Sequence, residues 1–204
     1  MAKAAGWPIL ELAAAYLRGG ARFLQLRAKA MPGDTFLATA SALVQLARRH
    51  GAHLIVNDRA DIARLSGADG VHVGQDDLSP ALVRAIVGGD AIVGLSTHTL
   101  DQVDLAVLEA VSYVAIGPVF GTATKSTGYE AVGLETVRSA AHCTNARRLP
   151  LVAIGGITLE NAARVLESGS ASVAVISDLL ATGDPEARVR AFVEELSRCQ
   201  RPRV

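Results

Sequence analysis

The sequence contains little cysteine, no excess of either charge and no long apolar segment. Its two cysteines, Cys143 and Cys199, are far apart, unlike the dense cysteine framework of a small secreted domain. Twenty basic residues balance twenty acidic residues without a basic run, so the electrostatic footprint of a nucleic-acid-binding protein is absent. No segment is long and apolar enough to span a bilayer, and Glu11 interrupts the apolar N-terminal stretch. We therefore expect a cytoplasmic protein with reduced thiols that binds neither nucleic acid nor membrane.

A glycine-rich turn after the first predicted strand, typical of an open doubly wound sheet, is also missing. Instead, short runs of Val, Ile, Ala and Leu alternate with stretches whose apolar residues recur at helical spacing. Such runs are typical of parallel strands that are covered on both faces. The predicted strands are residues 21–27, 53–58, 70–75, 91–96, 112–118, 151–156 and 172–177. The predicted helices include residues 9–18, 35–50, 80–87, 100–110, 134–147 and 159–168.

This alternation predicts a single domain over residues 1–204 with the (β/α)8 architecture of a TIM barrel, and an open doubly wound sheet is the alternative. A closed barrel requires eight strands, whereas the chain opens with a predicted helix at residues 9–18. Either residues 1–8 supply a poor edge strand, or the first strand is missing or truncated.

Polar or glycine-rich residues follow all seven predicted strands. The carboxyl ends of barrel strands open onto one face, where this fold places its active site, so these residues are expected to meet. Arg27, Lys29 and Lys125 supply cations that suit phosphate oxygens. Asp58 and Asp77 supply the hard oxygen ligands that Mg²⁺ takes together with waters and substrate phosphates. This combination indicates a site for a metal-bound diphosphate.

The acidic residues also have a simpler interpretation as helix caps. Asp58 could cap the helix that follows it, and Asp76 or Asp77 could cap the next helix, in competition with Ser79. Either acid alone favours capping, whereas two acids after adjacent strands favour metal binding. The sequence leaves both interpretations open.

Glycines and histidines near the strand ends are similarly ambiguous. Gly155 and Gly156 could offer backbone amides to a phosphate at a helix N-terminus, or could form a tightly packed turn. His72 lies within an apolar run and is expected to be a structural core residue. His98 lies at a strand end, where a structural and a functional role are about equally supported.

The loop GPVFGTATKSTGYEAVG, residues 117–133, is long and rich in hydroxyl groups and glycine. This composition, with one lysine, is expected of a flap over an anionic ligand, and disorder is the alternative. The apolar side chains of Val119 and Phe120 favour a loop that is packed at its base.

Across these motifs the chain strongly resembles the thiamine phosphate synthase family. The matching segments follow the family's order over nearly the whole chain: QLRAK at 25–29, VNDRADIA at 56–63, GADGVHVGQDD at 67–77, GLSTHT at 94–99, YVAIGPVFGTATK at 113–125, VAIGGIT at 152–158 and VAVIS at 173–177. The clear departure is the opening strand, which carries part of the substrate pocket in the family.

The resemblance implies an enzyme that joins a pyrimidine methyl diphosphate to a thiazole ethyl phosphate with the help of Mg²⁺. The residues expected to hold the diphosphate are Arg27, Lys29, Asn57 and Lys125, and those expected to bind the metal are Asp58 and Asp77. The residues expected to face the organic parts of the substrates are Gln25, Ser96, Thr122 and Thr124. The backbone amides expected at the thiazole phosphate belong to Gly156, Ile176 and Ser177. The catalytic roles would fall to Arg27, Lys29, Ser96 and Lys125.

Two alternatives to the synthase are considered. A thiazole tautomerase paralogue resembles the family but typically has histidine where this chain has Pro118, and no acid where it has Asp77. A non-catalytic remnant that binds a phosphorylated ligand would fit the short N-terminus, although the complete set of charged residues argues against it. Assembly into a homo-oligomer is left open by the sequence.

Overall fold

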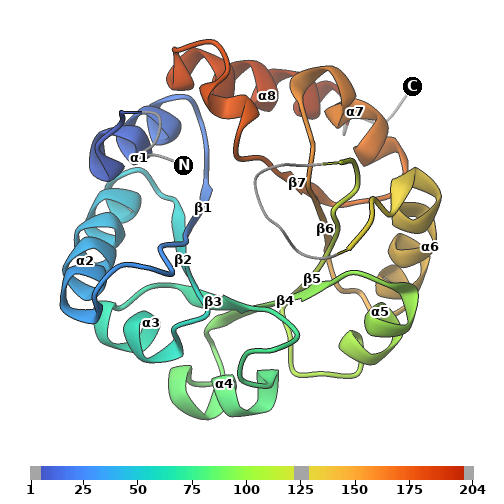
Figure 1. Cartoon of the computed structure of the whole chain (residues 1–204), viewed down its shortest axis with the longest axis horizontal. Coiled ribbons are helices and arrows are strands. Elements are labelled where there is room, and N and C mark those ends of the chain that lie inside the picture. Colours follow the sequence, from blue (N-terminus) through green and yellow to red (C-terminus); the bar gives the residue numbers. More distant parts are fainter. Residues whose placement is uncertain (1–5, 122–128, 200–204) are drawn as a thin grey trace.

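One parallel sheet of seven strands organises the chain (Figure 1). The structure is a computed structural model that describes residues 6–121 and 129–199. Each strand pairs in parallel with the next one along the sequence, from β1 to β7. The strands are β1 (Phe23–Leu26), β2 (His53–Asn57), β3 (Gly70–Val73), β4 (Ile92–Thr97), β5 (Tyr113–Ile116), β6 (Leu151–Ile154) and β7 (Ser172–Ala174). All seven predicted strands are therefore confirmed.

Helices surround this sheet on its outer side (Figure 1). They are α1 (Ile9–Arg18), α2 (Gly33–Arg49), α3 (Ala60–Ser66), α4 (Pro80–Val87), α5 (Leu100–Ala106), α6 (Gly133–Ala146), α7 (Leu159–Glu167), the short 3₁₀ helix η2 (Asp178–Leu180) and α8 (Pro185–Cys199). The predicted bounds of α1 and α4 are confirmed. The predicted α5 was four residues too long, because the chain turns after residue 106. No helix within the described residues is both long and apolar enough to cross a membrane.

The strand ring is open, whereas the helix ring is closed. In the described part of the chain β1 and β7 are the two edges of the sheet and do not pair with each other. The described residues do not form a closed barrel of eight strands, so that part of the prediction is wrong. Residues 6–8 lead directly into α1 and add no strand to the edge at β1, which agrees with the alternative of a missing or truncated first strand. On the outside, α1 packs against α8, and Arg18 Nε donates to Glu186 Oε2 at 2.7 Å.

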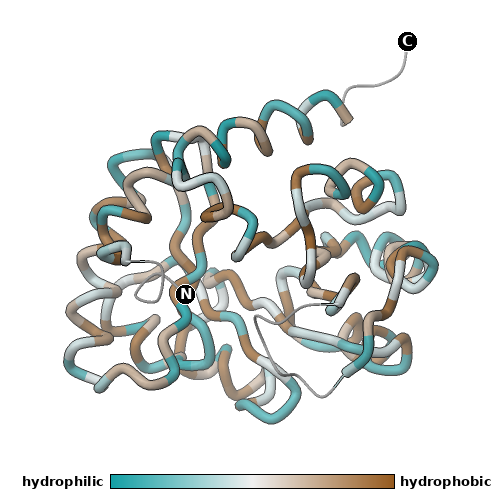
Figure 2. The backbone as a smooth tube through the Cα atoms, turned by 45° about the horizontal axis from the view of Figure 1, so that its top comes forward, coloured by the Kyte–Doolittle hydropathy of each residue, from teal (hydrophilic) through white to brown (hydrophobic). Residues whose placement is uncertain are grey.

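The two faces of the strands have different surroundings. Alternate residues such as Leu54, Val71 and Val114 point outward and are fully buried against the helices in one continuous core. Figure 2 shows the matching pattern in the helices, whose turns alternate between hydrophobic and hydrophilic colour. The other alternate residues line the interior of the curled sheet, where His72 and Tyr113 stack with ring centroids 5.5 Å apart.

Candidate active site

Three of the predicted site residues form a charged cluster at the carboxyl ends of β1, β2 and β3. Lys29 Nζ lies 3.0 Å from Asp58 Oδ2. Asp58 in turn contacts the carboxyl group of Asp77, and Asp77 Oδ2 accepts the backbone N–H of Gly74 at 2.8 Å. Adjacent parallel strands thus bring two carboxylates and one ammonium group together from positions far apart in the sequence, as expected for this face of the fold.

The backbone at Asp58 is held in an unusual conformation. Its φ angle is +65°, in the left-handed region that non-glycine residues rarely adopt. The turn is fixed on both sides, because Asp58 N–H donates to the carbonyl of His72 and Arg59 N–H donates to the carbonyl of Asn57, each at 2.8 Å. Non-glycine residues in such conformations cluster at functional sites. The turn aims the Asp58 side chain at the strand ends.

Neither acid caps a helix. The N-cap residue of α3 is Arg59, and α3 has no side-chain cap in the described structure. Ser79 caps α4, because its hydroxyl oxygen accepts from the backbone N–H of Leu82. The capping interpretation of Asp58 and Asp77 is therefore wrong, because neither carboxylate is used at the N-terminus of the helix that follows it.

The electrostatic surroundings of Asp58 oppose its ionisation. Burial raises the pKa of its carboxyl group above the ordinary value, and contact with the Asp77 carboxyl raises it further. The hydrogen bond from Lys29 acts in the opposite direction and lowers this pKa. Asp58 is half-buried and Asp77 is exposed. Two carboxylates in contact are costly without a counter-charge, so the cluster has the character expected of a cation site.

A second group of polar side chains crosses the interior of the sheet beside this cluster. His72 Nδ1 lies 2.8 Å from the Tyr113 hydroxyl, and His72 Nε2 lies 2.7 Å from Ser96 Oγ. The side chain of Gln25 hydrogen bonds to Tyr113, and Gln75 Nε2 donates to the backbone carbonyl of Ser96 at 2.6 Å. Burial raises the pKa of Tyr113 well above its usual range, so the phenol is neutral. The structure thereby joins the predicted residues Gln25 and Ser96 through two residues that the sequence did not assign to the site.

The glycines after β6 are required by packing. Gly155 and Gly156 have φ angles of +102° and +63°, and a Cβ atom on Gly155 would lie 2.6 Å from Pro118. A Cβ atom on Gly156 would lie 2.7 Å from the Cβ of Phe120. The interpretation as a tightly packed turn is therefore confirmed, and donation of the Gly156 amide to a phosphate stays a prediction.

The N-terminus of α7, which follows these glycines, is occupied by the protein itself. The Leu159 amide donates to Asp178 Oδ2 at 3.1 Å, and Thr158 with Asn161 forms a reciprocal capping box. Asp178 is held in turn by Arg188, whose Nη2 lies 2.8 Å away. These amides are therefore not available to a phosphate in this arrangement, and an anion would have to use the chain immediately after β6 and β7.

The predicted residues on β7 lie at that place. Ile176 and Ser177 follow the end of β7 and directly precede η2. Ile176 is half-buried and Ser177 is exposed. With Gly156 after the neighbouring β6, they lie at the end of the sheet away from the acidic cluster. Their role in holding a phosphate stays a prediction.

The loop after β5 is anchored at its two ends. Val119 N–H donates to the carbonyl of Ile154 at 2.9 Å, and Phe120 N–H donates to that of Gly155 at 3.1 Å. On the returning side, Val132 N–H donates to the carbonyl of Pro118. The expectation of a packed base is confirmed for these residues. The predicted site residues Thr122, Thr124 and Lys125 lie outside the described residues.

The remaining predicted residues are placed at the mouth without a common contact. Arg27 follows β1 directly and is exposed, whereas Asn57 ends β2 and is buried. His98, after β4, stacks on Tyr129 with ring centroids 4.0 Å apart, and its Nδ1 lies 2.5 Å from the carbonyl oxygen of Gly117. His98 therefore packs against the base of the loop after β5. No group of three or more His, Cys, Asp or Glu side chains suited to a metal is found within residues 6–121 and 129–199.

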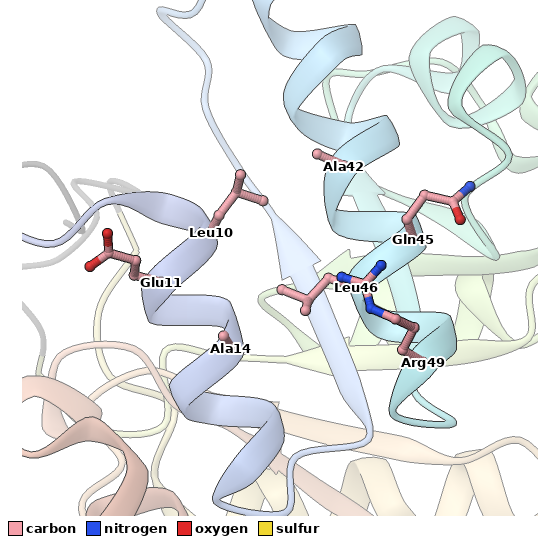
Figure 3. Close-up of a pocket in the computed structure, with 7 residues that line it drawn as sticks. All are labelled: Leu10, Glu11, Ala14, Ala42, Gln45, Leu46 and Arg49. Carbon is pink, nitrogen blue, oxygen red and sulfur yellow. The ribbon is translucent and has the colours of Figure 1, made fainter.

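A groove elsewhere on the molecule is unrelated to these residues. It lies between α1 and α2 on the outside of the fold (Figure 3). Leu10, Ala14 and Leu46 contribute apolar side chains to its lining, and Glu11 and Arg49 contribute charged ones. Its walls carry none of the predicted site residues, so the groove does not compete with the strand ends as the active site.

Fold and site together define a class of protein: a parallel α/β fold of the barrel type with acidic and basic side chains gathered at the carboxyl ends of its strands, where such folds bind phosphorylated small molecules. Comparison with known proteins narrows this class. The family model described as thiamine monophosphate synthase matches residues 2–179. The chain belongs to this family.

Individual relatives agree with the family model. The chain is 44% identical over 184 residues to thiamine-phosphate synthase of Roseiflexus sp. (strain RS-1), covering 90% of this chain and 77% of the relative. It is 37% identical over 195 residues to the enzyme of the same name from Moorella thermoacetica, covering 96% and 91% of the two chains. Among solved structures, thiamine phosphate pyrophosphorylase from Pyrococcus furiosus superposes with a TM-score of 0.88 at 30% identity, covering 95% of this chain and 92% of that one.

Proposed function

We propose that the protein is a thiamine-phosphate synthase, a transferase that couples 4-amino-2-methyl-5-(diphosphooxymethyl)pyrimidine to 4-methyl-5-(2-phosphoethyl)thiazole, or to its carboxylated form, and releases diphosphate. Membership of the thiamine monophosphate synthase family supports the reaction. The observation that carries the assignment to this chain is the cluster of Lys29, Asp58 and Asp77 at adjacent strand ends. Residues 1–204 are proposed to act as one domain, since a single sheet runs through the described chain.

The metal in this proposal is Mg²⁺, held by Asp58 and Asp77. The residues fit the ion, because Mg²⁺ takes one or two carboxylates together with waters and substrate phosphates. The pKa of Asp58 is raised, which means that its ionised form is disfavoured and would be stabilised by a neighbouring cation. When bound, the ion would neutralise charge on the diphosphate. The rest of the site contributes cations directly, through Arg27, Lys29 and Lys125.

These cations act on the leaving group. Diphosphate leaves readily only when its growing negative charge is stabilised, so the positive side chains bind it more strongly as the bond breaks than before. Asn57 orients the diphosphate. The aminopyrimidine supports a methylene cation, and the thiazole nitrogen is a nucleophile without further activation. The reaction is therefore a dissociative substitution without a covalent enzyme intermediate, and the protein holds the two substrates in line.

The thiazole phosphate binds at the carboxyl ends of β6 and β7, to backbone N–H groups of Gly156, Ile176 and Ser177. Asp178 follows these donors directly and would repel an anion if it were unpaired. Its salt bridge to Arg188 and its hydrogen bond to the amide of Leu159 remove that obstacle. Thr122 and Thr124, with Gln25 and Ser96, are proposed to contact the organic parts of the substrates.

A coupling assay on the purified protein tests this function. With both substrates and Mg²⁺, we expect thiamine phosphate and diphosphate in equal amounts, and no product after chelation of the metal. Asp77→Asn should abolish coupling. Asp76→Asn is the matched control, because Asp76 is the neighbouring exposed acid, and this variant should retain coupling. Isomerisation of the thiazole substrate without coupling would instead identify a tautomerase. If neither reaction occurs, the proposed function is refuted in favour of a non-catalytic ligand-binding protein.

A further inference from the structure

The backbone amides proposed to hold the thiazole phosphate come from two separate segments of the chain. Gly156 follows β6, whereas Ile176 and Ser177 follow β7. None of these three amides has a hydrogen-bond partner among the described residues. Unpaired amides at neighbouring strand ends are suited to an anion. They can act on the same phosphate only if the two segments are held at a fixed separation.

The side chain of Asp178 joins these two segments. Asp178 follows Ser177 directly and is the first residue of η2. Its Oδ2 accepts the backbone N–H of Leu159, the first residue of α7, at 3.1 Å. The carboxylate therefore ties the turn after β7 to the chain that follows β6. The pairing of β6 with β7 does not provide this link, because it ends before the donor segments begin.

Arg188 holds the same carboxylate from α8. Its Nε donates to Asp178 Oδ2 at 3.0 Å, and its Nη2 lies 2.8 Å from that oxygen. Only 10% of the Asp178 side chain and 15% of the Arg188 side chain are exposed, so solvent screens this pair weakly. Arg188 is itself held by Glu160 of α7, at 3.2 Å, and its guanidinium lies 5.8 Å from the ring centroid of Phe192. Asp178 is thus fixed by both α7 and α8.

We propose that Asp178 and Arg188 are positioning residues that hold the amides of Ile176 and Ser177 at a fixed separation from that of Gly156. The inference rests on the proposed function, because it concerns the affinity for the thiazole phosphate. Neither side chain contacts the substrate in this proposal. Donors that are fixed before binding give higher affinity, because they are not ordered at the expense of binding free energy.

A positioning role and a purely electrostatic role predict opposite effects when the Asp178 carboxylate is removed. Asp178→Leu removes a negative charge beside the anion and leaves Arg188 without this partner, so electrostatics alone would strengthen phosphate binding. If Asp178 positions the amides, the same variant frees the turn after β7 and weakens binding. We expect the Kd of the thiazole phosphate to rise about tenfold, the effect of one hydrogen bond. A Kd that falls or stays unchanged would refute the proposal.

The conservative variant at the same position tests whether the hydrogen bonds matter. Asp178→Asn keeps an oxygen that can accept from the Leu159 amide and from Arg188. Its Kd for the thiazole phosphate should stay within about threefold of the wild-type value. A loss as large as that of Asp178→Leu would contradict a role through these hydrogen bonds.

The second support is tested from α8. Arg188→Met leaves the Asp178 carboxylate without its counter-charge beside the amides, and we expect the thiazole phosphate to bind at least about tenfold more weakly. Arg190→Met is the matched control, because Arg190 lies on the same helix and pairs with Glu186 at the exposed surface. Equal affinities of these two variants would overturn the proposal. If Arg188→Met does not fold, Arg188→Lys replaces it. Lysine keeps the charge but has one donor nitrogen, so binding should weaken about threefold.

Isothermal titration calorimetry with the thiazole phosphate measures this affinity without the second substrate, and thermal unfolding establishes that each variant is folded. A separate titration with the pyrimidine diphosphate and Mg²⁺ distinguishes positioning from a general loss of structure. Its Kd should stay within about twofold of the wild-type value in every variant. Equal weakening of both ligands would reduce the ion pair to a structural role and refute the proposal.

Failure of the proposed function gives a different result. If the wild-type protein binds the thiazole phosphate but does not couple it, the synthase function is refuted, and the titrations of the variants still decide the positioning role. If the wild-type protein couples and the variants bind the thiazole phosphate as it does, the positioning role alone is refuted. If the wild-type protein does not bind the thiazole phosphate, the phosphate site and the positioning role are refuted together.

Discussion

Gly94 is the position at which the smallest change should disturb the site most. It lies in β4, paired in register with Tyr113 in β5. A Cβ atom at this position would lie 2.5 Å from His72 Nδ1 and closer still to Tyr113 Cζ and its hydroxyl oxygen. These are rigid rings, and His72 is in turn fixed to Ser96. Gly94→Ala therefore has to displace both aromatic side chains or the backbone of β4.

The expected cost follows from this geometry. One methyl group inserted into a well-packed site typically costs about 1–3 kcal/mol. For a chain of this size about 1 kcal/mol lowers Tm by roughly 2–4 °C, so the fall in Tm should be about 2–12 °C. Displacement of the two rings also breaks the hydrogen bonds that orient Ser96. The loss of kcat/KM for the pyrimidine substrate should therefore exceed the loss expected from reduced folding alone.

The measurement compares Gly94→Ala with Gly89→Ala by thermal unfolding and by coupling kinetics at a temperature where both variants are folded. An added Cβ at Gly89 meets nothing within 4 Å, so this control should keep wild-type activity and stability, or gain a few tenths of a kcal/mol. If Gly94→Ala unfolds at the wild-type temperature and retains wild-type kinetics, the packing of Tyr113 and His72 against β4 is refuted.

Three further predictions concern the acidic cluster and the base of the fold. Asp58→Asn keeps a side chain that tolerates the left-handed turn, so we expect a folded protein whose Tm no longer rises on addition of Mg²⁺, in contrast to the wild type. The pKa of Asp58 is raised in the folded state, so the metal-free protein should lose stability as the pH rises from the ordinary aspartate pKa through the raised value. Urea unfolding across pH 3–7, roughly the range of this titration, measures this loss. The wild type should show it and Asp58→Asn should not. Arg84 donates to the carbonyls of residues 89, 91 and 110 and to Ser112 Oγ, so Arg84→Met should cost about 2–4 kcal/mol in urea unfolding. Arg64→Met is the control and should change little, because no side-chain hydrogen bond of Arg64 is found in the described structure.

The central strands were predictable because both of their faces are covered. Residues such as Val71 and Val93 are fully buried against helices, and this environment selects the continuous apolar runs that the sequence displays. Closure of the sheet was not predictable in the same way. Closure requires a further strand that pairs with both β1 and β7. This pairing would join the two ends of the sheet, and local sequence patterns do not indicate whether it forms.

The candidate site shows the same division between local and distant information. The sequence places Asp58 and Asp77 after adjacent strands, and their contact follows from the parallel arrangement. The turn that removes Asp58 from a capping position depends on a hydrogen bond to the carbonyl of His72, a residue of the next strand. His72 was correctly expected to be buried, but its bond to Ser96 links residues on different strands. Tyr113 was unrecognised, because a tyrosine in an apolar strand is ordinary there.

The contact between the glycine turn after β6 and the base of the loop after β5 has a consequence for redesign. Gly155 and Gly156 leave no room for a side chain beside Pro118 and Phe120, and the two segments share hydrogen bonds at residues 119 and 120. A change that displaces one of these segments therefore has to displace the other, so reshaping the pocket at either segment affects both. Libraries that aim to alter the thiazole substrate should vary both segments together, since combinations across this contact will be strongly non-additive.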